Sequence, residues 1–498
     1  MGYRNLFVTL GILFFSASSQ QSFADLTAGT CNSNQKAVVS TDQSSFIGGK
    51  KVQFTAAAGY LEVTASDAKS KACIFYTSYV VTPTGNTVRP LIFAFNGGPG
   101  SASLWLHMGL VGPQRVDMGS DGLTVYNPFH LINNDSSLID IADVVMIDPV
   151  ATGFSSAEAD SESASDKFFG VKNDYQSIAQ FIRNYIDANN RWNSPKYVMG
   201  ESYGGIRGSL LAHHLQSDMG IFLNGVIFVS PWLSTTTTNF GESDNDLPYV
   251  CYLPTFATTA QFQKKIAPSY QAMDPQTLLT TAETFARGPY WQALQQGSDL
   301  ADADFHSTAK QVSDFTGIPQ SQVEDLNLRI ADSDFFGDLL QSENKVVGRY
   351  DSRFVGGRLP GQTGANASDP SDTATSGPFT AAVNFFLNSF VHFTSTTPYV
   401  TMANIQTWPM DSDGQEYGVM DDVSQAMIDN PQLRIYVASG IYDLAVPYET
   451  VRYNFEHLAP RLNLAGRVTI HRFPSGHMVY INPNALTTLK ADLATFVH

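Results

Sequence analysis

Short apolar segments bounded by turn residues are the clearest pattern along the chain. They lie at residues 91–95, 144–147, 197–199, 226–229, 435–438 and 468–473. Between them are stretches with apolar residues at helical spacing, such as Ile178, Phe181, Ile182 and Tyr185. Strands that alternate with helices indicate a mainly parallel sheet that is buried on both faces. The sequence therefore predicts an α/β fold.

Two regions depart from this alternation. Residues 51–82 alternate apolar and polar positions, with a turn expected at Gly59, which predicts antiparallel hairpins. Residues 232–400 contain helical patches, a threonine run at 235–238 and an expected loop from Gly361 to Pro378. We interpret 232–400 as a cap inserted over the carboxyl edge of the sheet, between domain parts 25–231 and 401–498. A separate third domain is the alternative that the pattern leaves open.

The N-terminal residues predict export. Arg4 precedes an apolar stretch at 6–15, and small residues at Ser22 and Ala24 stand at the −3 and −1 places of a cleavage site. We therefore expect a signal peptide at residues 1–24 and a mature protein in the periplasm, outside the cell or in an acidic lumen. No later apolar run is long enough to span a membrane, so we expect no membrane association after its removal.

Composition narrows the classes of partner. The chain has 29 basic and 46 acidic residues, a net charge of −17, and only 15% charged residues. A nucleic-acid partner is not expected, because it needs clustered Lys and Arg. The three cysteines, Cys31, Cys73 and Cys251, leave at least one unpaired and exclude a disulfide scaffold. Cys31 and Cys73 are candidates for a bridge, and three buried thiols are the alternative.

The candidate chemistry centres on a G-x-S-x-G sequence at residues 200–204. The apolar segment at 197–199 leads into it, and a predicted helix over 206–215 follows. This strand-to-helix turn lifts the hydroxyl of Ser202 out of the sheet and directs helix amides toward the reacting oxygen. We therefore predict Ser202 as a nucleophile.

A serine nucleophile needs a base, and the base needs an orienting carboxylate. In this fold the carboxylate and the histidine follow the serine in that order. Asp443 lies three residues beyond a predicted strand end at Val437-Ala438, and His477 lies in the loop after the strand at 468–473. We expect all three side chains at the same sheet edge, forming a Ser202, Asp443 and His477 triad.

A glycine-rich loop at 96–100 directly follows the strand at 91–95. Attack on a carbonyl develops an oxyanion, which needs backbone donors held in place. This loop is where the fold draws one donor, and the residue after the nucleophile gives the other. The predicted oxyanion donors are the N–H groups of Gly98 and Tyr203.

These motifs resemble the serine carboxypeptidases. The resemblance rests on Asn-Gly-Gly-Pro-Gly at 96–100, Gly-Pro at 112–113, Ile-Asp-Pro-Val-Ala-Thr-Gly-Phe-Ser at 147–155 and Gly-Glu-Ser-Tyr-Gly-Gly at 200–205. It implies an α/β-hydrolase fold with an inserted cap, the same triad and an acid-active exopeptidase. It also implies that Asn96, Gly97 and Glu201 bind the substrate's terminal carboxylate. Glu201 and the substrate's terminal carboxylate cannot both be ionised at hydrogen-bonding distance. A protonated Glu201 is therefore needed for binding, which favours activity at acidic pH.

Two positions depart from the family. Members usually carry a cysteine where this chain has Ser101, and commonly a second glutamate where it has Leu110. The loss of that carboxyl predicts weaker discrimination between a free and a blocked C-terminus.

The sequence thus predicts an exported serine carboxypeptidase that acts on peptides without a metal or other cofactor. An esterase or acyltransferase would use the same triad, a carbon–carbon lyase would need a reshaped pocket, and a catalytically silent binding protein would not react with a serine-directed phosphonate. Turnover of peptides and esters separates the first of these alternatives from a peptidase.

Overall fold

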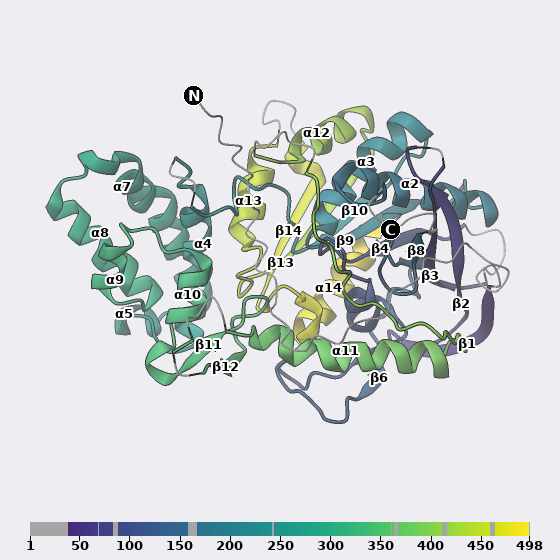
Figure 1. The fold of residues 1–498 in the computed structure, drawn as a ribbon, viewed down its shortest axis with the longest axis horizontal. Coiled ribbons are helices and arrows are strands. Elements are labelled where there is room, and N and C mark those ends of the chain that lie inside the picture. The colour runs from purple at the N-terminus through teal and green to yellow at the C-terminus, as the bar shows by residue number, and fades with distance from the viewer. Residues whose placement is uncertain are drawn as a thin grey trace.

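The computed structural model describes residues 38–497, except 68, 83–87, 158–166, 242–243, 360, 363–366, 411–415 and 459–463. Its centre is a ten-stranded sheet (Figure 1). The strands are β1 (Val39–Ile47), β2 (Lys50–Thr64), β3 (Lys71–Val80), β4 (Leu91–Phe95), β7 (Asp143–Ile147), β8 (Ser156–Ala157), β9 (Lys196–Glu201), β10 (Gly225–Val229), β13 (Arg434–Gly440) and β14 (Val468–Phe473).

The strand order is β1-β2-β3-β7-β4-β9-β10-β13-β14, with β8 paired to β3. Neighbouring strands from β7 to β14 are parallel, and β1, β2, β3 and β7 pair antiparallel. The expected mainly parallel sheet is therefore confirmed, and each apolar segment singled out in the sequence forms one of its strands. The predicted N-terminal signal peptide lies outside the described residues.

Helices cover both faces of the sheet. Both faces of β4 are apolar and need to be covered. Ile92 belongs to one hydrophobic cluster, and Leu91 and Phe93 belong to the other. The second cluster includes residues of α2 (Val171–Ala188), α3 (Gly204–Met219), α12 (Met420–Asp429) and α13 (Tyr448–Glu456). The first includes residues of α1 (Leu104–Leu106), the π-helix η1 (His107–Val111), α11 (Pro370–Ser389) and α14 (Pro483–Val497). This is the α/β-hydrolase fold.

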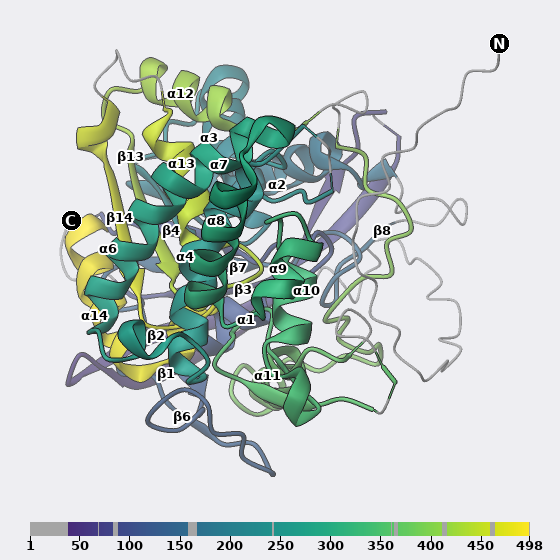
Figure 2. The same ribbon diagram turned by 90° about the vertical axis from the view of Figure 1, so that its left-hand side faces the viewer.

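Between β10 and β13 the chain forms a group of helices beside the sheet, which we call the helical lobe (residues 247–343; Figures 1 and 2). It has its own hydrophobic cluster, which also takes in Leu444 of the sheet body. Its elements are α4 (Leu247–Phe262), α5 (Pro268–Gln271), α6 (Pro275–Phe285), η3 (Ala286–Tyr290), α7 (Trp291–Gln296), η4 (Gly297–Asp299), α8 (Asp302–Thr316), α9 (Gln320–Asp325), α10 (Asp332–Asp338) and η5 (Gln341–Glu343). Two short hairpins, β5 (Gln114–Val116) with β6 (Leu131–Asn133) and β11 (Lys345–Val347) with β12 (Val355–Gly357), lie outside the main sheet.

Ion pairs join the lobe to the sheet body. Glu283 of α6 accepts hydrogen bonds from Tyr448 (2.9 Å) and Arg452 (2.8 Å) of α13. Arg287 of the lobe pairs with Glu449 of the same helix. Burial raises the pKa of Glu449 to about 6, although the nearby arginines lower it. The contact between lobe and body is therefore partly ionic as well as apolar.

The structure corrects two local predictions. The chain does not turn at Gly59, because β2 runs through it as one long strand and the first hairpin turns at Gly48 and Gly49. Part of the loop expected at 361–378 is helical, since α11 begins at Pro370, with Asp369 accepting a bond from the N–H of Ser371 as its N-cap. A proline at the first helical position removes no helical hydrogen bond, so Pro370 begins the helix, whereas Pro378, which marked the end of the expected loop, lies inside it.

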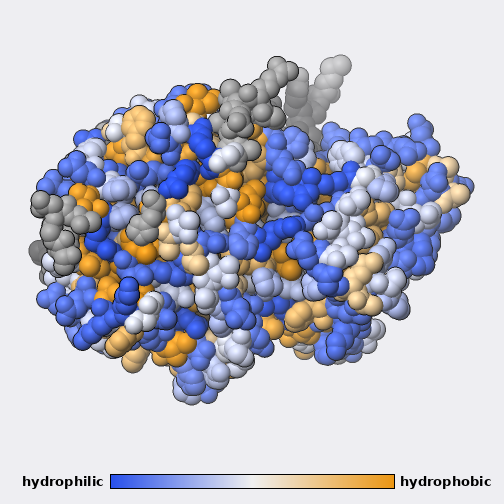
Figure 3. Space-filling model, turned by 180° about the vertical axis from the view of Figure 1, so that it is seen from behind, coloured by the Kyte–Doolittle hydropathy of each residue, from blue (hydrophilic) through white to orange (hydrophobic). Residues whose placement is uncertain are grey.

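The surface mixes polar and apolar residues. Figure 3 shows hydrophilic residues over both the sheet body and the lobe on the rear face, with hydrophobic residues interspersed. Within the described part of the chain, no helix combines the length and apolar character that a membrane span requires.

Candidate active site

Ser202 occupies a tight turn between β9 and α3. Its φ is +61°, a conformation that costs a non-glycine residue free energy and is common at functional turns. The Ser202 N–H donates to the carbonyl of Val229 at the end of β10 (3.1 Å), and its own carbonyl accepts from Gly205 (2.7 Å) and Trp232 (2.9 Å). These bonds hold the strained turn at the carboxyl edge of the sheet.

Asp443 and His477 meet at the same edge. The Asp443 Oδ2 lies 2.7 Å from His477 Nδ1, and its Oδ1 accepts the N–H groups of Ala445 (2.8 Å) and Val446 (2.9 Å). Both side chains are buried. Burial alone would lower the pKa of His477, but the charge and hydrogen bond of Asp443 outweigh it and raise that pKa. The pair is thus built to stabilise a protonated imidazole.

The end of β10 links the serine and histidine loops. Val229 accepts the Ser202 N–H, and the hydroxyl of the next residue, Ser230, donates to the carbonyl of His477 (2.8 Å). His477 Nε2 is buried and has no hydrogen-bond partner in the described part of the protein. The predicted triad residues are therefore brought to one place, with the base nitrogen free, while their catalytic roles stay predictions.

The glycine loop lies directly against the serine turn. A Cβ on Gly97 would lie 2.4 Å from the Tyr203 nitrogen and 2.6 Å from the Glu201 carbonyl oxygen, so only glycine fits there. Gly98 has φ +99°. Neither Gly98 nor Tyr203 donates its N–H to another described group of the protein. This arrangement agrees with the predicted oxyanion donors without testing them.

Glu201 is a buried carboxyl adjacent to the nucleophile. Burial raises its pKa to about 7, whereas the neighbouring His477, Tyr480 and Asn96 lower it and the charge of Asp443 raises it. Its Oε2 has no hydrogen-bond partner of normal geometry among the described residues. At acidic pH this group is a protonated carboxyl with a hydrogen available for a ligand.

Asn96 is buried beside Glu201 and is fixed by its own chain. Its Oδ1 accepts the N–H of Leu106 (3.0 Å), so its amide NH₂ is the end left for another partner. Its N–H donates to Ser103 Oγ (3.1 Å), and the Ser103 N–H donates to buried Asp148 (2.8 Å). The predicted carboxylate-binding residues Asn96, Gly97 and Glu201 thus lie together.

Arg207 and Asp174 support this loop, and the motif analysis missed both. The Arg207 guanidinium is fully buried and pairs with Asp174 through two bonds (2.8 and 3.1 Å). Its third contact is with the carbonyl of Asn96 (2.6 Å). One feature of the sequence points to Arg207: it is the single charge at the otherwise small and apolar start of the predicted helix, Gly-Gly-Ile-Arg-Gly.

A segment from the predicted insertion also reaches the site. We call residues 349–353 the clamp segment. The carbonyl of Tyr350 accepts the N–H of His477 (2.6 Å), and Asp351 accepts the N–H of Gly476 (3.2 Å). Asp351 is buried in an ion pair with Arg353, whose shortest contact is 2.6 Å. The clamp segment therefore fixes the histidine loop.

The same segment holds the aspartate loop. The carbonyl of Arg349 accepts the N–H of Leu444 (3.0 Å), and the Ser352 N–H donates to the carbonyl of Tyr442 (3.0 Å). These bonds flank Asp443 on both sides. No sequence motif marks this segment, because its bonds join residues that are far apart in the sequence.

The structure also shows the surroundings of the two residues that depart from the family pattern, Leu110 and Ser101. Leu110 is fully buried in the hydrophobic cluster that contains α14. The Ser101 hydroxyl donates to the Ala102 carbonyl (2.9 Å) and accepts from Trp105 Nε1 (3.1 Å). Cys73 is disulfide-bonded and Cys251 is a free, buried thiol, whereas Cys31 lies outside the described residues.

In the described portion of the chain, no three His, Cys, Asp or Glu side chains are grouped as metal ligands would be. The adjacent His213 and His214 pair with different carboxylates, Asp422 (3.1 Å) and Asp218 (2.7 Å).

Comparisons with known proteins agree with the motifs. A family model described as serine carboxypeptidase matches residues 48–316. Among curated proteins, serine carboxypeptidase-like 36 of Arabidopsis thaliana is 27% identical over 186 residues, which is 37% of this chain and 36% of that protein. Serine carboxypeptidase-like 37 of the same plant is 29% identical over 191 residues, or 37% of each chain. The matches thus span a little over a third of these relatives.

The solved structures that match are more distant in sequence. A thermostable carboxyl esterase from Bacillus coagulans has a TM-score of 0.37 at 12% identity, covering 88% of this chain and 97% of its own. A peroxisomal alpha-beta-hydrolase from Saccharomyces cerevisiae has a TM-score of 0.35 at 11% identity, covering 93% and 90%.

Proposed function

The chain belongs to the serine carboxypeptidase family, and from this premise we propose that it is an exported serine-type carboxypeptidase. It hydrolyses peptide bonds at or near the C-terminus through an acyl-enzyme, most actively at acidic pH. The observation that carries the proposal is the buried carboxyl of Glu201 beside the nucleophile, with its pKa raised to about 7. A general esterase has no need of a protonated carboxyl at this place.

The proposed reaction begins at Ser202. As its hydroxyl oxygen attacks the peptide carbonyl, His477 Nε2 takes the hydroxyl proton and Asp443 stabilises the imidazolium. The N–H groups of Gly98 and Tyr203 stabilise the oxyanion. His477 then gives its proton to the leaving amine, the C–N bond breaks, and a water activated by His477 hydrolyses the Ser202 ester.

Recognition of the free C-terminus is assigned to the buried pair next to the nucleophile. The NH₂ of Asn96 and the protonated carboxyl of Glu201 donate hydrogen bonds to the terminal carboxylate of the peptide. An ionised Glu201 would repel that carboxylate, so binding weakens as Glu201 loses its proton. This accounts for the expected preference for acidic conditions.

The first test is the triad itself. Ser202→Ala should abolish labelling by a serine-directed phosphonate and lower kcat/KM by at least about 10³-fold while the fold is retained. His477→Ala should act similarly, and Asp443→Asn somewhat less. Labelling and circular dichroism are measured together. Phosphonate labelling of Ser202→Ala at the level of the unaltered protein would contradict the assignment.

The class of substrate is tested with the same Ser202→Ala protein as the blank. A mixed peptide library is incubated at pH 4 and pH 7, and the products are identified by mass spectrometry. Loss of C-terminal residues, faster at pH 4, is the expected result. Turnover of small esters with no peptide cleavage at either pH would favour an esterase or acyltransferase.

A further inference from the structure

Three buried polar atoms at the candidate site lack a hydrogen-bond partner of normal geometry among the described residues. They are Glu201 Oε2, His477 Nε2 and the Tyr480 hydroxyl. Buried polar groups are nearly always satisfied, and the exceptions call for an explanation. His477 Nε2 is explained by its proposed role as a base. The other two atoms lie within hydrogen-bonding reach of each other, and their contact lowers the pKa of Glu201 and raises that of Tyr480.

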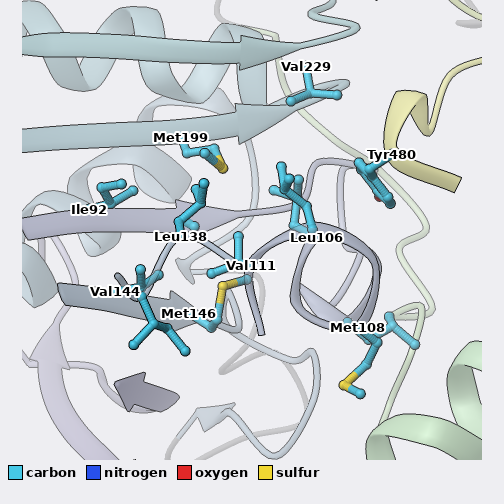
Figure 4. Packing of buried hydrophobic residues seen from close by; sticks show 14 of the residues in the cluster. Ile92, Leu106, Met108, Val111, Leu138, Val144, Met146, Met199, Val229 and Tyr480 are labelled. Atoms are coloured by element: carbon cyan, nitrogen blue, oxygen red, sulfur yellow. The ribbon is translucent and has the colours of Figure 1, made fainter. Parts of the chain in front are cut away.

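The fold fixes the Tyr480 ring in place. Tyr480 lies in the 3₁₀ turn η9 (Val479–Ile481), three residues after His477, and its side chain is almost completely buried. A Cβ on Gly109 would lie 2.3 Å from a ring carbon, so the absence of a side chain at Gly109 makes room for the ring. Figure 4 shows the Tyr480 ring beside Leu106, near the end of the strand that carries Val229. The ring therefore has little freedom to turn its hydroxyl elsewhere.

Three donors meet at this point. Asn96 directs its NH₂ toward Glu201 and Tyr480, whose pKa values it lowers, since its Oδ1 is occupied by the Leu106 N–H. Glu201 presents a protonated carboxyl at acidic pH, and Tyr480 presents a phenol that keeps its hydrogen over the whole working range. A single anionic acceptor with two oxygens would satisfy them together.

We propose that the Tyr480 hydroxyl is a further binding residue, which donates a hydrogen bond to the terminal carboxylate of the substrate together with Asn96 and Glu201. The inference rests on the proposed carboxypeptidase function and adds a neutral donor to its recognition site. Since the phenol does not ionise with Glu201, it sustains part of the carboxylate recognition when Glu201 has lost its proton.

Tyr480→Phe tests this, because it keeps the ring and removes only the hydroxyl. For a peptide with a free C-terminus, kcat/KM should fall about 10- to 100-fold, the range for a charge-assisted hydrogen bond. The fall should lie mainly in KM, because the bond is present in both ground and transition states. For the C-terminal amide of the same peptide, kcat/KM should fall less than about fivefold. The preference of the enzyme for the free acid over the amide therefore shrinks.

Tyr290→Phe is the matched control. Tyr290 is also buried, but its hydroxyl donates to the carbonyl of Leu328 within the helical lobe (2.7 Å). The Tyr290→Phe variant should leave the ratio of acid to amide turnover unchanged, even if its melting temperature is lower. An unchanged acid-to-amide ratio in Tyr480→Phe would overturn the proposal.

A second measurement separates this inference from the proposed function. If a small ester is hydrolysed but no peptide is, the carboxypeptidase assignment fails, and binding then decides the role of Tyr480. An N-acyl amino acid and its amide are titrated calorimetrically into Ser202→Ala and Ser202→Ala/Tyr480→Phe. Weaker binding of the acid alone by the double variant supports the proposal, and equal binding by both proteins overturns it.

Discussion

Glu201 combines burial with a place next to Ser202, the proposed nucleophile, so under the proposed function its ionisation acts directly on the binding of substrate. The groups that face it are His477, Tyr480, Asn96 and Asp443. Against the effect of burial, the charge and hydrogen bond of Asp443 raise the pKa of His477, and the ionisation of His477 changes the chemical step rather than the binding of a carboxylate. The two effects can therefore be separated by measuring KM and kcat independently.

Glu201→Gln should flatten the pH dependence of KM. In the unaltered protein, KM for a peptide acid should rise as pH passes through about 7, because Glu201 then ionises beside the substrate carboxylate. Glutamine stays neutral, so its KM should vary little between pH 5 and 8.5. An ester without a carboxylate serves as control. The same KM profile in both proteins would show that Glu201 does not bind the carboxylate.

The clamp segment fixes the loops of Asp443 and His477, which lie far away from it in the sequence. Its buried Asp351 and Arg353 form one ion pair, and breaking a buried pair leaves an uncompensated charge. The segment bonds directly to the backbone of His477 through Tyr350 and to the residues on either side of Asp443, so it positions these two side chains.

Asp351→Asn should therefore lower both stability and turnover. We expect a loss of about 3 to 5 kcal/mol in the free energy of unfolding. We also expect kcat to fall about tenfold or more with little change in KM, since a misplaced base slows the chemical step. Asp246→Asn, which breaks the lobe ion pair with Arg329 (2.7 Å), is the control and should leave kcat unchanged. A stability loss in Asp351→Asn with unaltered kcat would assign the segment a purely structural role.

The sequence predicts an element well when the contacts that form it join residues close together in the chain. The parallel strands and the turn at Ser202 follow from local apolar patterns and glycines, and they are confirmed. Gly59 and Pro378 mislead because a glycine can continue a strand and a proline can lie within a helix when tertiary packing supports it. The clamp segment and the Arg207 contact with Asn96 join distant residues, and a local pattern carries no record of such bonds.

For the whole molecule, buried carboxyls tie stability to acidity. Burial raises the pKa values of Asp148 to about 6, Glu201 to about 7 and Glu449 to about 6. A carboxyl whose pKa is higher in the folded than in the unfolded state favours folding while protonated. Its contribution is complete below the unfolded pKa and is lost as pH rises through the folded one. These three groups therefore favour the folded state most below about pH 4, where carboxyls are protonated in both the folded and the unfolded state.

The free energy of unfolding should accordingly fall as pH rises from 5 to 8, and Glu201→Gln should reduce that fall. For Glu201 alone the difference between the two proteins amounts to roughly 3 kcal/mol. Denaturant titrations at pH 5, 6.5 and 8 measure it, and other titrating groups cancel in the comparison. Parallel curves for the two proteins would mean that Glu201 ionises as readily in the folded state as in the unfolded state.

The path of the chain through the clamp segment also limits how substrate preference can be exchanged between relatives. The helical lobe lies between the end of β10 and the start of β13, and these two points suggest themselves as boundaries for replacing it. Such a graft would bring a foreign segment into contact with the loops of Asp443 and His477. A functional chimera must therefore keep residues 349–353 with the recipient, so the natural boundary for recombination lies inside the insertion, before the clamp segment.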